Sequence, residues 1–368
     1  MSAPRASAPF ETRPVEFPGD ATAVGGRETR IGLMLPLRSQ TLGAPAEALR
    51  AGFMAAYEHE REGFIVNLVD TGDSLQENLN AYAAAVEQND IMVGPLARPA
   101  VSALAASALV RKPTIALNHP VALPSAAALP AQMLVIGLSI EDEARQVATW
   151  AGTEHPDGTA LIIAGSSAWQ RRIAASFAAR WKQLGYSSQM LVVADSNGYL
   201  SEASLGQLSA QLDAAQPALL FTALDASQAG QVRGALGPEL PIYGTSSVNP
   251  GTFAGAGADP GAVLTELNGL RLLDLPWEVD SAHPAVMAYP RWSGATARTL
   301  DMDRLYALGI DAFRVAREIA LRPGADINLD GVTGRLSVRF GNGPARFERI
   351  EPAAVYEGGA FTLVPDRR

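Results

Sequence analysis

Apolar residues follow two spacings that alternate along the chain, and this alternation gives the first account of the fold. From Arg30 the run RIGLMLPL predicts a buried strand, and residues 42–60 then carry apolar side chains at helical spacing. The same order continues through FIVNLVD, a helix over 75–87, IMVG, a helix over 97–110 and PTIALN. Strands that alternate with helices predict a parallel sheet covered by helices on both faces.

The alternation starts again at residue 133. The run MLVIGLS (133–139) precedes a predicted helix over 140–153, which Ser139 can cap and whose first turn holds Glu141, Asp142 and Glu143. Further strands are expected at 159–165, 187–195, 217–224 and 241–246, with helices over 168–184, 203–214 and 226–236. Two α/β units of similar size predict two lobes with a cleft between them.

The C-terminal part of the chain follows a different pattern. A strand within LNGLRLLDLPW (267–277) is followed by a long predicted helix over 303–321 and by a small β meander from 331. Because a helix followed by hairpins cannot simply extend either sheet, we expect the chain to cross back between the lobes. The predicted division is a flexible tail (1–28), a first lobe (29–132 plus 278–325) and a second lobe (133–277 plus 326–368).

Composition narrows the possible functions. The chain has 368 residues with a formal net charge of −9, which argues against a nucleic-acid surface. It has no cysteine, so disulfides, thiolate metal sites and cysteine nucleophiles are excluded. The only lysines, Lys112 and Lys182, lack a serine three residues before them, which excludes the Ser-x-x-Lys acyl-enzyme signature. We therefore expect a protein that is not an enzyme.

One segment resembles a metal site. The stretch from Asp326 to Gly331 (DINLDG) matches the opening of an EF-hand calcium loop. The twelfth position is Ser337, however, where the loop needs a bidentate glutamate. We prefer the interpretation as a polar turn before a hairpin, and we expect neither a metal nor a cofactor.

Several longer motifs carry a resemblance to a known family. They include VGPL at 93–96, IALNHP at 115–120, LSIEDEARQVA at 138–148, GLRLLDLPW at 269–277, RLYALGIDAFRVA at 304–316 and GVTGRLS at 331–337. In this order they resemble the C-terminal domain of the LppC/LpoA family, outer-membrane lipoproteins that activate a class A penicillin-binding protein. The two-lobed plan resembles type I periplasmic binding proteins more widely.

This resemblance implies a two-lobed type I periplasmic-binding-protein-like fold with several crossovers between the lobes. It implies a non-enzymatic regulator of peptidoglycan synthesis in the periplasm, anchored in the outer membrane by a lipid and partnered by a class A penicillin-binding protein. An alternative function is a solute-binding subunit of an ABC transporter that takes an amino acid, a peptide or another small ligand.

A cleft ligand, if this chain binds one, is expected at the carboxyl ends of the strands. We refer to the turn between the predicted strand IMVG and the following helix as the corner. There Ala97-Arg98-Pro99 stands where amino-acid receptors tend to have a serine, and Pro99 removes one N–H from the start of the helix. This lowers the expectation of an amino-acid ligand, although Arg98 offers a charge for a carboxylate. The candidate ligand-binding residues are Arg38, Ser39, Leu96, Arg98, Asn118, Ser166, Trp169, Asp225 and Ser246.

Overall fold

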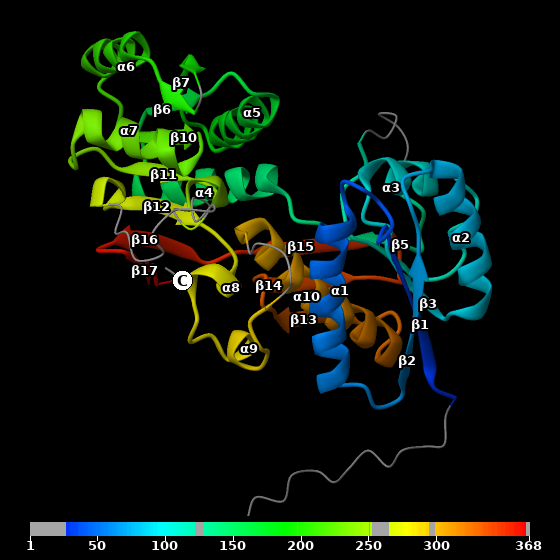
Figure 1. The fold of residues 1–368 in the computed structure, drawn as a ribbon. Helices are drawn as coiled ribbons and strands as arrows, with labels where there is room; N and C mark the ends of the chain where they lie inside the picture. The colour runs from blue at the N-terminus through cyan, green and yellow to red at the C-terminus, as the bar shows by residue number, and fades with distance from the viewer. Residues whose placement is uncertain are drawn as a thin grey trace, which may run out of the picture.

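The computed structural model describes residues 27–121, 129–196, 198–249, 251, 265–293 and 299–365. These residues form two lobes, each built on a largely parallel sheet with helices on both faces, so the predicted α/β class is confirmed (Figure 1). The tail predicted over 1–28 lies outside the described residues except for Arg27 and Glu28.

The first lobe has a five-stranded sheet in the order β2-β1-β3-β4-β5. Helices α2 and α3 cover one face and α1 and α10 the other, because apolar residues alternate in direction along each strand and meet a different helix pair on each side. The strands are β1 (Thr29–Leu35), β2 (Phe64–Asp70), β3 (Ile91–Val93), β4 (Thr114–Ala116) and β5 (Met133–Val135). The helices are α1 (Gly43–His59), α2 (Leu75–Gln88), α3 (Arg98–Ala105) and α10 (Leu300–Leu321).

The second lobe has a seven-stranded sheet in the order β17-β16-β12-β11-β10-β6-β7, in which the last two strands of the chain pair antiparallel. Its strands are β6 (Ala160–Ala164), β7 (Ser188–Val192), β10 (Leu219–Ala223), β11 (Ile242–Gly244), β12 (Leu270–Leu273), β16 (Ala353–Glu357) and β17 (Ala360–Leu363). Helices α4 (Ile140–Glu154) and α5 (Ala168–Gln183) pack on one face, and α6 (Glu202–Ala215) and α7 (Ala226–Leu236) on the other. The short elements β8 (Asp195–Ser196), β9 (Tyr199–Leu200), η1 (Ser246–Val248) and η3 (Thr265–Leu267) complete this lobe.

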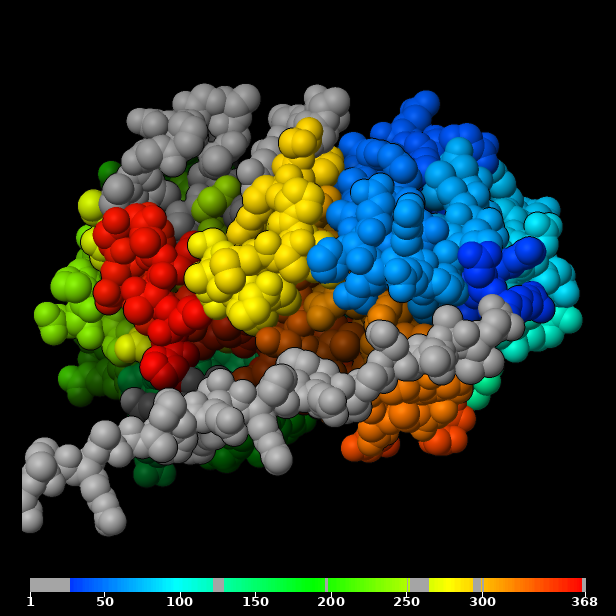
Figure 2. Space-filling model, turned by 90° about the horizontal axis from the view of Figure 1, so that it is seen from below, coloured from blue at the N-terminus to red at the C-terminus, as the bar shows by residue number. Residues whose placement is uncertain are grey.

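A third, three-stranded sheet lies between the lobes. It consists of β13 (Asp326–Asp330), β14 (Arg335–Arg339) and β15 (Arg346–Ile350), and its inward side chains belong to the core of the first lobe. The short helices α8 (Pro276–Val279) and α9 (Pro284–Met287) follow β12. In Figure 2 the segment with α8 and α9, in yellow, lies between the blue first lobe and the red and green parts of the second lobe.

The structure corrects three predictions. The strand at 133–139 was expected to open the second lobe, but β5 pairs with β4 in the first sheet. The segment from 326 was also assigned to the second lobe, but β13–β15 form a sheet of their own on the first core. The polar turn expected at 326–331 is instead strand β13, because Ile327 is buried and its polar neighbours point to solvent.

Three short segments therefore connect the lobes. Residues 136–139 lead from β5 to α4, residues 274–275 lead from β12 to α8, and residues 351–352 lead from β15 to β16. We refer to these three segments and the side chains buried between them as the pivot, because any change in the angle between the lobes has to occur there.

The tightest helix contact in the first lobe is between α1 and α10. A Cβ atom at Gly52 would overlap the backbone carbonyl of Tyr306, and one at Gly309 would overlap that of Leu49. Glycine at these two positions lets the two backbones approach closely along the apolar face of each helix. Phe53 and Phe313 pack edge to face in this contact, with ring centroids 5.4 Å apart.

Gly309→Ala is expected to destabilise the protein by about 1–3 kcal/mol, since the added methyl meets a helix backbone that cannot yield. Gly206→Ala is the matched control, because Gly206 is an exposed glycine in α6 with no atom within 4 Å of its ideal Cβ position. In α6 the better helix propensity of alanine is expected to raise the stability by about 0.5–1 kcal/mol. Urea unfolding of both variants measures this, and a Gly309→Ala protein as stable as Gly206→Ala would contradict the packing argument.

Candidate functional site

The predicted ligand-binding residues lie at the strand ends, but most of their polar groups are already bonded within the chain. Arg38 pairs with Asp70 and Glu77 across the end of β2. Ser39 accepts the backbone N–H of Leu42 at 2.9 Å, and Asp225 caps α7 in a capping box. Leu96 is buried in the first core, Asn118 accepts the N–H of the next residue, and Ser166 donates to Asp195. Trp169 lies in the first turn of α5 and packs on the core of the second lobe.

The corner, between β3 and α3, is closed, because its side-chain polar groups are hydrogen-bonded within the chain. The guanidinium of Arg98 donates to the backbone carbonyls of His119 and Pro120, at 3.2 and 3.4 Å. The Ser102 hydroxyl donates to the carbonyl of Arg98 and accepts the N–H of Val121. Pro99 occupies the start of α3, and the capping residue Ala97 has no side-chain hydrogen bond to offer. The helix end that could hold an anion therefore has few donors left.

Ser246 connects the predicted residues to the pivot. Its backbone N–H donates to the Glu143 carboxylate at 2.8 Å, and its carbonyl accepts from the Arg304 guanidinium at 3.1 Å. Glu143 lies in the first turn of α4, whereas Arg304 comes from α10 of the first lobe. The end of β11 is thus held by groups from two other parts of the chain.

An ion pair between Arg304 and Asp274 lies at the centre of the pivot. Asp274 follows β12 directly and is fully buried, and its Oδ2 lies 2.6 Å from Nη2 of Arg304. The carboxylate also accepts the N–H of Leu275 and the side-chain amide of Asn249, both at 2.8 Å. Burial alone would lower the pKa of Arg304, but the charge and hydrogen bond of Asp274, together with the charges of Glu143 and Glu278, outweigh burial and raise the pKa. The guanidinium of Arg304 therefore stays charged at this contact between the two lobes.

Three further carboxyl groups lie beside this pair: those of Glu143 and Glu351 are buried, and Glu278 is half-buried with its Oε1 atom buried. Burial and then the charge of Asp274 raise the pKa of Glu143 to about 7 and that of Glu278 to about 8. For Glu351, burial and the charge of Glu143 raise the pKa well above the ordinary carboxyl value. Near neutral pH these three glutamates are therefore protonated to a larger extent than exposed glutamates are.

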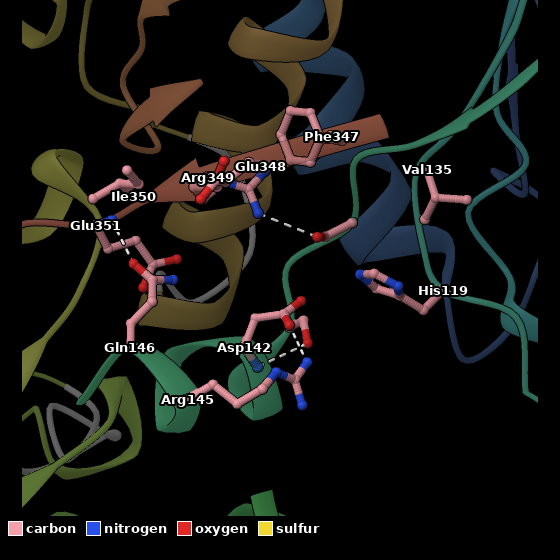
Figure 3. Close-up of a pocket in the computed structure, with 12 residues that line it drawn as sticks. His119, Val135, Asp142, Arg145, Gln146, Phe347, Glu348, Arg349, Ile350 and Glu351 are labelled. Carbon is pink, nitrogen blue, oxygen red and sulfur yellow. Dashed lines mark hydrogen bonds and ion pairs between the residues drawn. The ribbon is translucent and has the colours of Figure 1, made fainter. Parts of the chain in front are cut away.

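A cavity of about 230 Å³ opens beside the pivot (Figure 3). Its walls come from the segment that leads into α4 and from the end of β15, with His119 at one side. Arg349 points across it and donates to the carbonyls of Ile136 and Gly137, at 2.8 and 3.1 Å. Gln146 accepts the N–H of Glu351 at 3.1 Å. Because two connections of the pivot form its walls, the shape of the cavity depends on how the lobes are placed.

Two negative findings apply to the described ranges. In them no group of three or more histidine, aspartate and glutamate side chains is placed to hold a metal ion. No helix in the same part of the chain is both long enough and apolar enough to cross a membrane.

Sequence analysis missed the pivot residues, although some signals were present. Asp274 follows the apolar run LRLL directly, but Asp70, Asp195 and Asp225 stand in similar places, so this signal alone does not indicate a buried ion pair. Arg304 begins the apolar part of its predicted helix, directly after Asp301 and Asp303. Glu143 was assigned to the helix dipole, whereas the structure turns it inward onto Ser246. The partners lie far apart in sequence, so spacing alone does not pair them.

Comparison with known proteins identifies the family. The profile described as LppC putative lipoprotein matches residues 24–342. This chain belongs to the LppC family. Two curated relatives of this LppC chain are penicillin-binding protein activators named LpoA. The one from Yersinia pseudotuberculosis is 27% identical and aligns with 72% of this chain, and the one from Glaesserella parasuis is 28% identical and aligns with 90%.

The chain spans about half the length of these relatives, 45% of the first and 54% of the second. A putative branched-chain amino acid ABC transporter protein from Chromobacterium violaceum is 33% identical with a TM-score of 0.71, over 89% of this chain and 100% of that one. The LpoA C-domain from Haemophilus influenzae also gives a TM-score of 0.71, at 24% identity, over 92% of this chain. The predicted type I periplasmic-binding-protein-like fold and the predicted family are confirmed.

Asp274→Asn is expected to lower the free energy of unfolding by about 3–5 kcal/mol, because it leaves the buried Arg304 guanidinium without its counter-charge. The control is Glu87→Gln, which breaks an ion pair with Arg111 in which both side chains are 65% exposed. Such an exposed pair contributes about 0–1 kcal/mol. Guanidinium unfolding of both variants makes the comparison, and equal small losses would contradict a structural role for the buried pair.

Glu278→Gln is expected to change how stability depends on pH. The pKa of Glu278 is raised to about 8 in the folded protein. The stability that its protonated side chain contributes is therefore fully present below the unfolded-state pKa and is lost as pH rises through 8. The free energy of unfolding of the variant should match that of the parent near pH 5 and be larger near pH 9, by up to about 1.4 kcal/mol for each pH unit between the two pKa values. Thermal melts from pH 5 to 9 test this, and parallel curves for the two proteins would exclude the shift.

Proposed function

We propose that this LppC chain is a non-enzymatic regulatory module that binds and activates a class A penicillin-binding protein in the periplasm. In this proposal the protein is held at the outer membrane as a lipoprotein, and it needs neither a cofactor nor a metal. The family description as putative lipoproteins and the naming of two relatives as penicillin-binding protein activators support it.

The closed corner at α3 is the observation that favours a regulator over a receptor. An amino-acid receptor of this fold needs free donors at that helix end to hold a carboxylate. Here Arg98 is bonded to two carbonyls, Pro99 removes an N–H, and Ala97 supplies no hydroxyl. The lobes are connected instead by the internal pair of Arg304 and Asp274. Partner binding by the outer surface of the two lobes fits this arrangement.

The second candidate function is a solute receptor for an ABC transporter. The 33% identity to the Chromobacterium violaceum protein, titled a putative branched-chain amino acid ABC transporter, favours it. In this case the nine strand-end residues named from the sequence remain the predicted contacts, and Arg98 is the group expected to receive a ligand carboxylate.

Binding to the purified periplasmic region of a class A penicillin-binding protein from the same organism tests the proposal. We expect saturable binding by biolayer interferometry and a faster rate of peptidoglycan synthesis when this chain is added. The matched control is the periplasmic region of a class B penicillin-binding protein, which should neither bind nor respond. A folded chain that leaves both binding and rate at background would refute the proposed activation.

Thermal melting with free amino acids tests the receptor alternative separately. We expect leucine, isoleucine and valine at millimolar concentration to leave the melting temperature unchanged. The alternative instead predicts a rise with one of them in the parent protein and the loss of that rise in Arg98→Ala.

A further inference from the structure

Each of the three connections between the lobes places a carboxyl group in the same buried cluster. Glu143 follows the first connection, Asp274 and Glu278 belong to the second or follow it directly, and Glu351 lies in the third. Glu143, Asp274 and Glu351 are 0–7% exposed. The segments that must rotate when the lobes move are therefore the segments that bring these acids together.

The cluster has more acids than cations. Its guanidinium groups belong to Arg304 and Arg349, and a third, that of Arg291, faces Glu278. Arg304 is bonded to Asp274, whereas Arg349 gives its hydrogen bonds to the carbonyls of residues 136 and 137 and to the Thr333 hydroxyl. No ion pair with a cluster carboxylate is described for Arg349. Among the described residues, the ion pair printed within this cluster is thus that of Arg304 with Asp274, and the three glutamates lie around it.

The glutamates also lack the hydrogen bonds that would stabilise three negative charges. Glu143 accepts one backbone N–H, from Ser246. Glu278 Oε1 and Glu351 Oε2 are buried and have no hydrogen-bond partner among the described residues. A buried carboxylate in this situation is costly, whereas a buried carboxylic acid is tolerated.

Each glutamate faces at least one other acidic group as well as at least one guanidinium. Glu143 faces Asp274 and Arg304, and Glu351 faces Glu143, Asp274, Arg304 and Arg349. Glu278 faces Asp274, Asp303, Arg304 and Arg291, the last of which stacks on Trp277. Arg349 in turn faces Asp142 and Asp311 in addition to Glu143 and Glu351. Ionisation of any one glutamate therefore adds repulsion within the cluster.

We propose that the pivot is a proton-coupled hinge, in which protons on Glu143, Glu278 and Glu351 hold the two lobes at the angle seen in the structure. Loss of these protons places up to three additional negative charges between the connections. The connections are only two to four residues long, so they relieve this repulsion by changing the angle between the lobes and admitting water. The proposal concerns the chain alone and does not depend on what the lobes bind.

Distance measurement between two spin labels tests the proposal. The chain has no cysteine, so Ala84→Cys in α2 and Ala175→Cys in α5 give one label on an exposed helix position in each lobe. We expect one narrow distance distribution at pH 6. At pH 9 we expect the distance distribution to shift or broaden by more than its width at pH 6. The midpoint of this transition should lie between pH 7 and 8.

The triple variant Glu143→Gln, Glu278→Gln, Glu351→Gln removes the titration while it keeps the size of the side chains. In the labelled background it should show the pH 6 distribution at both pH values. A double variant at exposed sites, Glu87→Gln with Glu202→Gln, is the matched control and should respond to pH as the parent does. An unchanged distribution in the parent at pH 9, or the full response in the triple variant, would overturn the proposal.

If the triple variant does not fold, as judged by circular dichroism, single variants decide the question. Glu278→Gln and Glu351→Gln should each reduce the size of the pH response.

Amide hydrogen exchange of unlabelled protein is a second measurement. Protection at residues 136–139 and at the Glu351 amide should fall between pH 6 and pH 9, after correction for the intrinsic rate, more than protection in β6 and β10. Equal changes in all four segments would contradict a hinge at the pivot.

Discussion

The contact between Arg304 and Asp274 determines how the two lobes are held together. It joins a helix of the first lobe to the end of a central strand in the second, with 2.6 Å between the charged atoms and almost no exposure to solvent. The stability of such an ion pair depends strongly on its geometry, because a small displacement leaves two buried charges unpaired. The hydrogen bonds of Asp274 to Leu275 and Asn249 fix the carboxylate, so the pair acts as a rigid point between lobes that otherwise share three thin connections.

The packing of α10 against α1 is what brings Arg304 to that point. Gly52 and Gly309 allow the two helix backbones to approach more closely than side chains would permit, which sets the height of α10 above the first sheet. Further along the same helix, Asp311 accepts the N–H groups of Val332 and Thr333 and so ties β13 and β14 to the first core. A single helix therefore orders the first lobe, the third sheet and the ion pair to the second lobe.

Local patterns predicted most elements but not their partners. The helices at 140–153 and 226–236 were predicted within a residue, because capping residues and apolar spacing are local properties. The run 133–139 was assigned to the wrong sheet, since an apolar strand of this kind pairs equally well with either neighbour until the tertiary contacts choose. The expectation that ligands bind at strand ends led to Ser246. Its partners Arg304 and Glu143 are 58 and 103 residues away in sequence, and no rule of residue spacing pairs groups that far apart. Buried charges of this type become predictable only when the helix faces and the sheet order are both known.

The pivot also bears on how this fold would serve the regulatory role proposed above. In a receptor the ligand supplies the charges and hydrogen bonds that close the cleft, so the lobes separate when the ligand leaves. In this LppC chain Arg304 supplies them from within, and the strand end at Ser246 is bonded on both its N–H and its carbonyl without any ligand. An angle held by groups of the chain itself presents one outer surface at a given pH, which suits recognition of another protein. In the proposed hinge, the protonation of Glu143, Glu278 and Glu351 is what changes that angle.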